Sequence, residues 1–226
     1  MQLFVTATDT GVGKTFVTAG LVRALRAGGR DAQAMKPIAS GIEHGPDGPH
    51  NADLTTLAGA GGGVAPDDLN VYSFAPAIAP HRAAELAGVR IDLGDIRSTF
   101  ERLTARRQDV LVEGVGGFAV PLSPDLMLAD LVRALNLPLL LVVGVRLGCI
   151  NHALLSATAI RAEGLKMVGW IANRVDPSMA EAGASIEAIA TRIGTPLLGT
   201  LSFDADADEF ASLANRLLAS PAWPGR

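Results

Sequence analysis

The sequence has almost no cysteine: Cys149 is the only one among its 226 residues. One thiol cannot form a disulfide within the chain, and it cannot supply the ligands of a multi-cysteine metal site. Because Cys149 stands at the start of an apolar helical pattern, we interpret it as an inert packing residue rather than a nucleophile. Aromatic residues are also scarce, at 4%. We therefore expect a core built mainly of Leu, Val, Ile and Ala side chains.

Long apolar runs and an excess of positive charge are missing as well. No run reaches the ~20 residues of a membrane-spanning helix, and no secretory leader pattern opens the sequence. The net charge of −4 weighs against a nucleic-acid binder, which needs a dense basic face. Hydrophobic residues at 49% and charged residues at 19% are typical of a folded globule. We expect a cytoplasmic protein with no membrane and no nucleic-acid partner.

The most informative stretch is residues 8–15, Thr-Asp-Thr-Gly-Val-Gly-Lys-Thr, between a short apolar run and a helical pattern. Gly11 and Gly13 allow the backbone to curl so that successive N–H groups face one concavity, and the following helix adds its dipole. We expect Lys14 to reach the β- and γ-phosphates of a nucleotide and the Thr15 hydroxyl to bind Mg²⁺. The first glycine of the usual pattern is replaced by Thr8. The stretch still predicts a phosphate-binding loop; the alternative is a structural turn with a solvated lysine.

Apolar runs and helical patterns alternate along the rest of the chain. We expect strands at residues 2–7, 31–35, 71–74, 109–114, 138–145, 167–173 and 196–201. We expect helices at residues 14–27, 94–107, 127–135, 180–193 and 209–219, two short ones after 51–53 and from 80, and one from 151 to about 164. We expect loops at residues 36–41 and 43–51. This alternation predicts an α/β fold with a parallel sheet and helices on both faces, P-loop NTPase-like, in one domain over residues 1–226 with 221–226 as a loose tail.

A second signal is the acid Glu113, which ends a buried apolar strand just before Gly114, Gly116 and Gly117. This placement is typical of a Walker-B-type Mg²⁺ ligand, and the alternative is an acid that faces solvent. Residues 10–15, 36–40, Asp53 and 113–117 should meet at the carboxyl ends of neighbouring strands.

The chemistry of this expected meeting point is that of a phosphate and metal site. Thr15, Asp53 and Glu113 are oxygen ligands of the kind that Mg²⁺ prefers, and Lys14 and Lys36 add positive charge. From the residues alone we predict an ATP- and Mg²⁺-dependent phosphoryl transfer to a small acceptor.

Five groups of short motifs, from the first strand to Asn173, match one family. They are Phe4-Val5-Thr6 with Thr8-Asp9-Thr10 and Val12-Gly13-Lys14-Thr15; Lys36-Pro37 with Ala39-Ser40-Gly41; Val112-Glu113-Gly114 with Gly116-Gly117; Val142-Val143-Gly144-Val145 with Leu147-Gly148-Cys149-Ile150-Asn151-His152-Ala153; and Gly169-Trp170 with Ala172-Asn173. With these motifs the sequence resembles the dethiobiotin synthetases, the ATP-dependent ring-closing enzymes of biotin synthesis. The Leu-Gly-Cys-Ile-Asn-His run is particularly specific, because a generic P-loop protein has no reason to contain it.

The resemblance implies a reaction and an assembly. One amine of 7,8-diaminononanoate reacts with CO₂, supplied as CO₂ or bicarbonate, to give a carbamate. ATP phosphorylates the carbamate to a carbamic–phosphoric anhydride, and the second amine then closes the cyclic urea, dethiobiotin, with release of ADP and phosphate. The family is dimeric, with the substrate tail near the subunit interface, so the resemblance also implies a homodimer.

The resemblance further implies a role for each matching residue. Lys36, Lys14 and Thr10 would be catalytic, with the two lysines near the carbamate and the transferring phosphoryl group. Thr10 and Ser40 would help to hold the diamine or carbamate. The nucleotide would be bound by Gly11, Val12, Gly13, Lys14, Thr15, Phe16, Asp53, Glu113, Gly114, Gly116 and Asn173, of which Asn173 reads the adenine and Thr15, Asp53 and Glu113 surround Mg²⁺. The substrate carboxylate would be held by Gly148, Cys149, Ile150 and Asn151, at a helix start.

Two other classes of protein share the phosphate-binding loop. A deviant P-loop ATPase, which regulates or partitions partners, would carry its signature lysine at Asp9, where this sequence has none. A nucleotide-binding module without catalysis is disfavoured by Lys36 and by the carboxylate pair of Asp53 and Glu113. Dependence of ATP turnover on a small diamine, rather than on a protein, DNA or membrane partner, would discriminate among these classes.

Overall fold

A six-stranded parallel sheet forms the centre of the computed structural model, which describes residues 1–45, 48–63 and 65–220. Its strand order is β10-β9-β8-β1-β7-β2, and every pairing between neighbours is parallel. The strands are β1 (Gln2–Ala7), β2 (Ala32–Met35), β7 (Asp109–Glu113), β8 (Leu139–Gly144), β9 (Met167–Asn173) and β10 (Leu197–Leu201). The predicted α/β class is confirmed, and β1 and β9 match their predicted bounds residue for residue.

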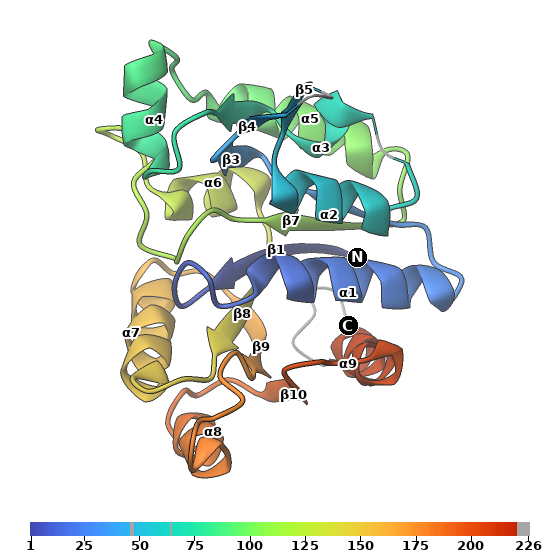
Figure 1. Cartoon of the computed structure of the whole chain (residues 1–226), viewed down its shortest axis with the longest axis vertical. Coiled ribbons are helices and arrows are strands. Elements are labelled where there is room, and N and C mark those ends of the chain that lie inside the picture. The colour runs from blue at the N-terminus through green and yellow to red at the C-terminus, as the bar shows by residue number, and fades with distance from the viewer. Residues whose placement is uncertain (46–47, 64, 221–226) are drawn as a thin grey trace.

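Helices cover both faces of this sheet (Figure 1). They are α1 (Lys14–Ala27), α2 (Ala52–Ala60), α3 (Pro66–Leu69), α4 (Pro80–Ala87), α5 (Leu93–Thr104), α6 (Leu128–Leu135), α7 (Cys149–Ala162), α8 (Ala182–Ala190) and α9 (Ala207–Ala219). Buried residues of α1, α2 and α9 share one apolar cluster, and those of α5 to α8 belong to the other. In the described part of the chain, no helix combines the length and the apolar character needed to cross a membrane.

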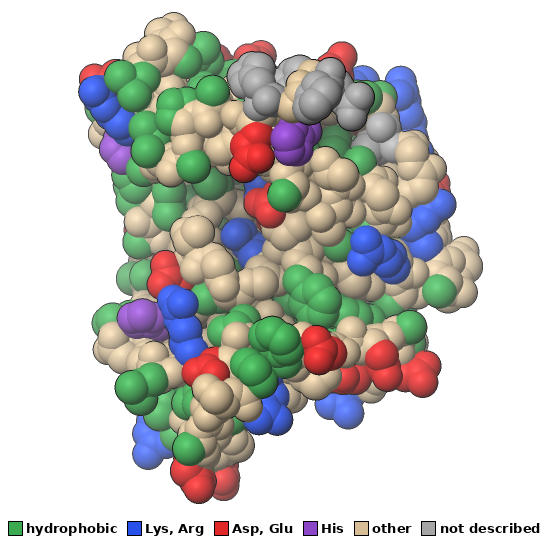
Figure 2. All heavy atoms as spheres, in the orientation of Figure 1, with side chains coloured by type: hydrophobic (Ala, Val, Ile, Leu, Met, Phe, Trp, Pro, Cys, Tyr) green, Lys and Arg blue, Asp and Glu red, His purple; other side chains and the backbone are tan. Residues whose placement is uncertain are grey.

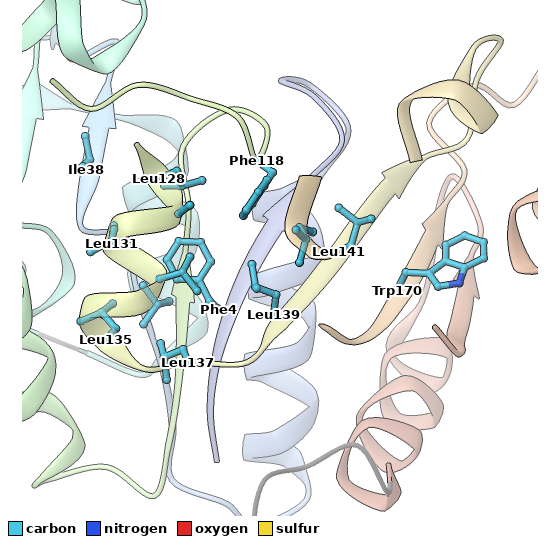
Figure 3. Packing of buried hydrophobic residues seen from close by; sticks show 14 of the residues in the cluster. Phe4, Ile38, Phe118, Leu128, Leu131, Leu135, Leu137, Leu139, Leu141 and Trp170 are labelled. Carbon is cyan, nitrogen blue, oxygen red and sulfur yellow. The ribbon is translucent and has the colours of Figure 1, made fainter. Parts of the chain in front are cut away.

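The two apolar clusters exist because successive side chains of a strand point to opposite faces of the sheet. In β1, Leu3 and Val5 pack into the cluster with α1, whereas Phe4 packs into the cluster with α6. Figure 3 shows Phe4 beside Leu128 and Leu131 of α6. Strands buried on both faces carry unbroken apolar runs, which is why β8 was recognisable in the sequence.

Two segments expected to be loops contain strands instead. Residues 36–41 include β3 (Ile38–Ser40), which pairs in parallel with β6 (Tyr72–Phe74), and residues 43–51 contain the hairpin of β4 (Glu43–Gly45) and β5 (Gly48–His50). The strand at residues 71–74 was predicted, but β3 and its pairing with that strand were not, because the two strands lie more than 30 positions apart. In the hairpin, glycine and proline masked the short strands. Helix α3 was not predicted, and the predicted tail at 221–226 lies outside the described residues.

A buried ion pair stabilises the edge of the sheet and gives a first prediction. Asp109 begins β7, and its side chain is 0% exposed. Arg30 donates from Nε and Nη2 to its two oxygens at 2.6 and 2.8 Å. Burial alone would raise the pKa of Asp109, but the hydrogen bonds of Arg30 and of the Met1 ammonium outweigh it and lower that pKa. The stabilisation is therefore present above the unfolded-state pKa of about 3.9 and is lost as the pH falls through the lower folded-state value.

We expect Asp109→Asn to lower the free energy of unfolding by about 3 kcal/mol at neutral pH, because Arg30 and the Met1 ammonium lose their charged partner. The difference from the wild type should shrink below about pH 4. Urea unfolding at both pH values measures this. Asp31→Asn is the matched control: Asp31 is half-exposed beside Arg107, so its loss should cost less than about 1 kcal/mol. Equal losses for the two variants would contradict the assignment.

Candidate active site

A cavity of about 850 Å³ opens where the carboxyl ends of β1, β7 and β2 lie side by side. Ligands of open α/β sheets bind at this edge. The residues around it come from five segments of the chain: Asp9, Thr10, Gly11, Gly13, Lys14, Thr15, Lys36, Ser40, Asp53, Ala77, Ile78, Ala79, Pro80, Val115, Gly116, Gly117 and Val120. Figure 2 shows this side of the molecule hollowed, with basic and acidic side chains visible in the hollow. The structure thus brings together the segments that were expected to converge.

The loop between β1 and α1 owes its shape to two glycines. Gly11 and Gly13 have φ of 71° and 82°, in the left-handed region that disfavours other residues. Gly13 is also the N-cap of α1, so the helix begins at Lys14 with its N–H groups directed toward the cavity end. A Cβ atom on Gly13 would stand 2.2 Å from Asn173 Nδ2, which donates a hydrogen bond to the Val12 carbonyl at 2.9 Å. Asn173, at the end of β9, therefore holds the phosphate-binding loop in place through this hydrogen bond.

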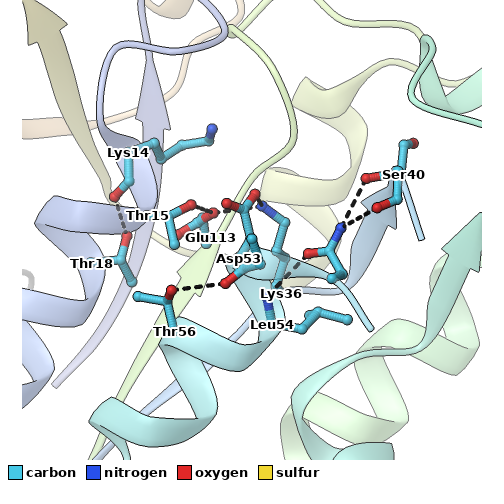
Figure 4. A network of polar contacts seen from close by, with 12 residues as sticks. Lys14, Thr15, Thr18, Lys36, Ser40, Asp53, Leu54, Thr56 and Glu113 are labelled. Carbon is cyan, nitrogen blue, oxygen red and sulfur yellow. Dashed lines mark hydrogen bonds and ion pairs between the residues drawn. The ribbon is translucent and has the colours of Figure 1, made fainter. Parts of the chain in front are cut away.

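A network of charged groups lies at the floor of the cavity, where Lys36 and Asp53 line it and Glu113 is buried behind the lining (Figure 4). Lys36 follows β2, and its Nζ donates to Asp53 Oδ2 at 2.5 Å and to Glu113 Oε1 at 2.7 Å. The Thr15 hydroxyl donates to the same Glu113 oxygen at 2.8 Å. Glu113 ends β7 with its side chain 0% exposed, so the alternative of a solvent-facing acid is wrong. Asp53 is 46% exposed and comes from the first turn of α2, which Asn51 caps through the Leu54 amide.

The two cavity lysines are in opposite electrostatic situations. Burial dominates for Lys14 and lowers its pKa, although Glu113 acts against this. Burial would lower the pKa of Lys36 too, but the adjacent Glu113 and Asp53 outweigh it and raise that pKa. Burial of Asp53 would raise its pKa, but Lys36 outweighs this effect and lowers it. Lys36 is therefore held as an ammonium between two carboxylates, whereas burial disfavours the charge of Lys14 and an anionic ligand beside it would favour that charge. The sequence has only three lysines, and two of them line this cavity.

The oxygen atoms of this network fit a magnesium ion. The Thr15 hydroxyl and the carboxylates of Asp53 and Glu113 meet around one position, and hydroxyl and carboxylate oxygens are the ligands that Mg²⁺ prefers. Glu113 Oε2 is buried and has no hydrogen-bond partner among the described residues. A buried carboxylate oxygen without a partner is costly, and a cation would satisfy it.

Some of the other predicted binding residues line the cavity, and others pack behind the residues that line it. Thr10, Ser40 and Gly116 line the cavity, and Ser40 Oγ is buried without a partner among the described residues. Val12 is buried behind the loop, and Phe16 packs edge-on against Phe210 at 5.2 Å. A Cβ atom on Gly114 would lie 2.9 Å from the Phe4 ring. Within this chain Val12, Phe16 and Gly114 shape the site without lining the cavity.

The run from Gly148 to Asn151 does not line the cavity of its own chain. Gly148 is the N-cap of α7 with φ of 91°, Cys149 is buried, and Asn151 is exposed. The neighbouring Leu147 is 93% exposed.

One wall of the cavity was not predicted from the sequence. Residues 77–80, before and at the start of α4, stand with Val115 and Val120 around its apolar part. A helix from Pro80 was predicted, but the preceding Ala-Ile-Ala carried no signal of a binding role. Asp9, at the cavity edge, accepts a hydrogen bond from Arg146 Nη2 at 2.7 Å, a contact between segments 137 positions apart.

The chain is similar to known proteins over most of its length. A family model described as an AAA domain matches residues 1–210. The ATP-dependent dethiobiotin synthetase BioD of Xanthomonas oryzae pv. oryzae is 48% identical over 209 residues, which cover 92% of this chain and 93% of that protein. The protein of the same name from Aromatoleum aromaticum is 49% identical over 208 residues, covering 91% and 92%.

Among solved structures, a chain of the MinC:MinD cell division protein complex of Aquifex aeolicus has a TM-score of 0.61 and covers 100% of this chain and 98% of its own, at 16% identity. This likeness shows the P-loop NTPase fold alone. The sequence relatives show the family as well as the fold, because they are almost half identical to this chain across nearly its whole length. The chain belongs to the ATP-dependent dethiobiotin synthetases, a family of ATP-dependent ligases.

Proposed function

We propose that this protein converts 7,8-diaminononanoate, CO₂ and ATP to dethiobiotin, ADP and phosphate through a carbamate and a carbamic–phosphoric anhydride. The observation that carries the proposal is the pairing of Lys36 with the carboxylates of Asp53 and Glu113, beside Lys14, at the floor of a cavity that begins at the phosphate-binding loop. The family supports the overall reaction. The carbamate and anhydride steps are those that the resemblance to the family implies, and the charged groups of the site suit them.

The chemistry of the substrates sets what the site must do. An alkylamine has a pKa of about 10.4 in water, so one amine must lose its proton before it attacks CO₂. The carbamate that results is an anion, and it must approach the anionic γ-phosphate of ATP. In our proposal, Lys14 binds the transferring phosphoryl group and Lys36 lies between that group and the carbamate. Both ammonium groups offset repulsion in a buried site, where charges interact more strongly than in water.

The remaining residues would position the reactants. Thr10 and Ser40 offer hydroxyl groups to the diamine and carbamate, and the apolar wall of Ile78, Val115 and Val120 suits the alkyl chain. Asn173 uses its Nδ2 for the Val12 carbonyl, which leaves Oδ1 to accept a hydrogen bond from the adenine amino group.

The substrate carboxylate would be held from outside the chain's own cavity. We propose that Gly148, Cys149, Ile150 and Asn151 bind the carboxylate in the cavity of a second subunit, within a cytoplasmic homodimer, since they do not line their own cavity.

Thr15, Asp53 and Glu113 would hold Mg²⁺, which when bound offsets the charge of the β- and γ-phosphates. Glu113→Gln keeps the shape of the side chain but removes its charge. We expect the Mg²⁺ concentration for half-maximal activity to rise at least about tenfold, because ligand charge sets affinity for this hard cation. A Mg²⁺ titration at saturating ATP measures this. The control is Glu85→Gln, an exposed acid on α4, and an unchanged titration for Glu113→Gln would remove it from the ligand set.

The rival function, a regulatory or partitioning ATPase, gains no support from the site. Its signature lysine would occupy the position of Asp9, whose carboxylate instead pairs with Arg146. The likeness to MinD lies in the fold, which many unrelated functions share.

Phosphate release tests the proposed function. Purified protein with Mg²⁺ and ATP should release phosphate only when both 7,8-diaminononanoate and bicarbonate are present. Omission of either should reduce release to the background of a protein-free sample. Release that is indifferent to the diamine would contradict the proposal and favour a switch ATPase.

A further inference from the structure

The Lys36 ammonium contacts the same carboxylate oxygens that we propose as ligands of Mg²⁺. Its Nζ lies 2.5 Å from Asp53 Oδ2 and 2.7 Å from Glu113 Oε1, and it is the described cation that bridges both carboxylates. The Lys36 side chain is 5% exposed, so little water is available to replace these contacts. The Thr15 hydroxyl donates to the same Glu113 oxygen. All three proposed ligands are thus already engaged, the two carboxylates by Lys36 and the Thr15 hydroxyl by Glu113.

The formal charges of the floor balance in this arrangement. Lys14 and Lys36 contribute two positive charges, and Asp53 and Glu113 contribute two negative charges. Asp9 is paired with Arg146 and adds nothing to the sum. A divalent cation that entered alone would leave this buried site with an excess of two positive charges. A nucleotide triphosphate brings several negative charges, so the same cation arriving with it would meet no such penalty.

The two lysines differ in how they would oppose a free cation. Lys14 opposes it only by charge, since its ammonium makes no hydrogen bond or ion pair with either carboxylate among the described residues, and Figure 4 shows no such contact. Lys36 opposes it by charge and also by occupying the ligand oxygens. Replacing each lysine in turn therefore separates the effect of charge from the effect of occupied ligand oxygens.

We propose that Lys36 closes the metal site of the nucleotide-free protein, so that the site takes Mg²⁺ with the nucleotide and rejects the free ion. The inference rests on the proposed function, because it takes Thr15, Asp53 and Glu113 as the ligands. It gives Lys36 two successive partners. The ammonium first neutralises the two carboxylates, and it is released toward the phosphoryl group and the carbamate when the metal–nucleotide complex replaces it. Release of Lys36 is then coupled to the arrival of ATP.

Binding of Mn²⁺ to the nucleotide-free protein, followed by the electron paramagnetic resonance of the free ion, tests this directly. We expect weak binding to the wild type and binding at least about tenfold tighter to Lys36→Met, because the variant frees two carboxylates. Lys14→Met removes the same charge but frees no ligand oxygen, so its gain should be clearly smaller. Lys36→Arg should stay weak, since it keeps the charge. Lys166→Met, which removes the third lysine of the chain in a groove elsewhere, should match the wild type.

Three results would overturn the inference. They are equal Mn²⁺ affinity of wild type and Lys36→Met, equal gains for Lys36→Met and Lys14→Met, and wild-type binding that is as tight without ADP as with it. The last comparison needs only the wild type, so the test stands even if Lys36→Met does not fold. If the wild type bound no Mn²⁺ even with ADP present, Thr15, Asp53 and Glu113 would not be the metal ligands, and both that part of the proposed function and this inference would be wrong. If Mn²⁺ binding depended on ADP but Lys36→Met bound free Mn²⁺ no more tightly than the wild type, the proposed function would stand and only this inference would fall.

Discussion

Lys14→Met is expected to reduce turnover by about 10²–10³-fold, the usual cost of removing one charged or hydrogen-bonding group that stabilises the transition state. Lys14 is the first residue of α1, it is buried, and its pKa is lowered because burial outweighs the attraction of Glu113. A group in that state gains most from an anionic partner, and the transferring phosphoryl group is the partner we assign. The measurement is steady-state dethiobiotin formation with ATP and diamine both saturating.

Lys166→Met is the control for Lys14→Met, because it removes a lysine outside the cavity and leaves the floor unchanged. Its activity should equal that of the wild type. Thermal unfolding of all three proteins shows whether any loss comes from the fold. Turnover of folded Lys14→Met within a few-fold of the wild type would contradict the assignment of the phosphate-binding loop.

Lys36→Met is expected to lower kcat by about 10²-fold while the affinity for ATP changes little. The reason is that we place Lys36 between the phosphoryl group and the carbamate, a contact that matters most in the transition state. Single-turnover kinetics with separate nucleotide-binding measurements divide the two effects. Lys36→Arg keeps the charge but changes the shape of the donor, so partial recovery is expected.

Loss confined to ATP affinity in Lys36→Met would show that Lys36 only binds the nucleotide. The variant also leaves Asp53 and Glu113 without their cation, so its unfolding must be measured with and without Mg²⁺ and ADP. We expect the metal–nucleotide complex to recover part of the lost stability, because it offers the carboxylates a replacement partner. No recovery would argue that the two carboxylates do not face the metal.

The sheet and the phosphate-binding loop could be predicted because their signals are local. The bounds of β1 and α1 follow from an apolar run, two glycines and the Lys-Thr pair, all within neighbouring residues. Glu113 was predictable for the same reason, since an acid at the end of an apolar strand stands out. Parallel topology then implied that the loops after β1, β2 and β7 would meet.

What escaped prediction depends on contacts between distant residues. The pairing of β3 with β6 has no local pattern, and neither has the apolar wall at residues 77–80. The resemblance places Gly114 among the nucleotide-binding residues, and the nearby Phe4 ring adds a packing reason for a glycine there that the sequence did not show. The sequence also suggested a lysine for phosphates and carboxylates for a metal, but not that Lys36 would bridge the two carboxylates. These features are set by tertiary packing, which a single sequence does not display.

The most direct test of the central claim is the fate of the carbon atom of CO₂. The protein should be supplied with ¹³C-bicarbonate, 7,8-diaminononanoate, Mg²⁺ and ATP, and the products analysed by mass spectrometry together with ADP. We predict dethiobiotin that carries the ¹³C label, formed in step with ADP, and none when ATP is omitted. ADP formed without labelled dethiobiotin would contradict the account, because the cavity would then hydrolyse ATP without joining the diamine to CO₂.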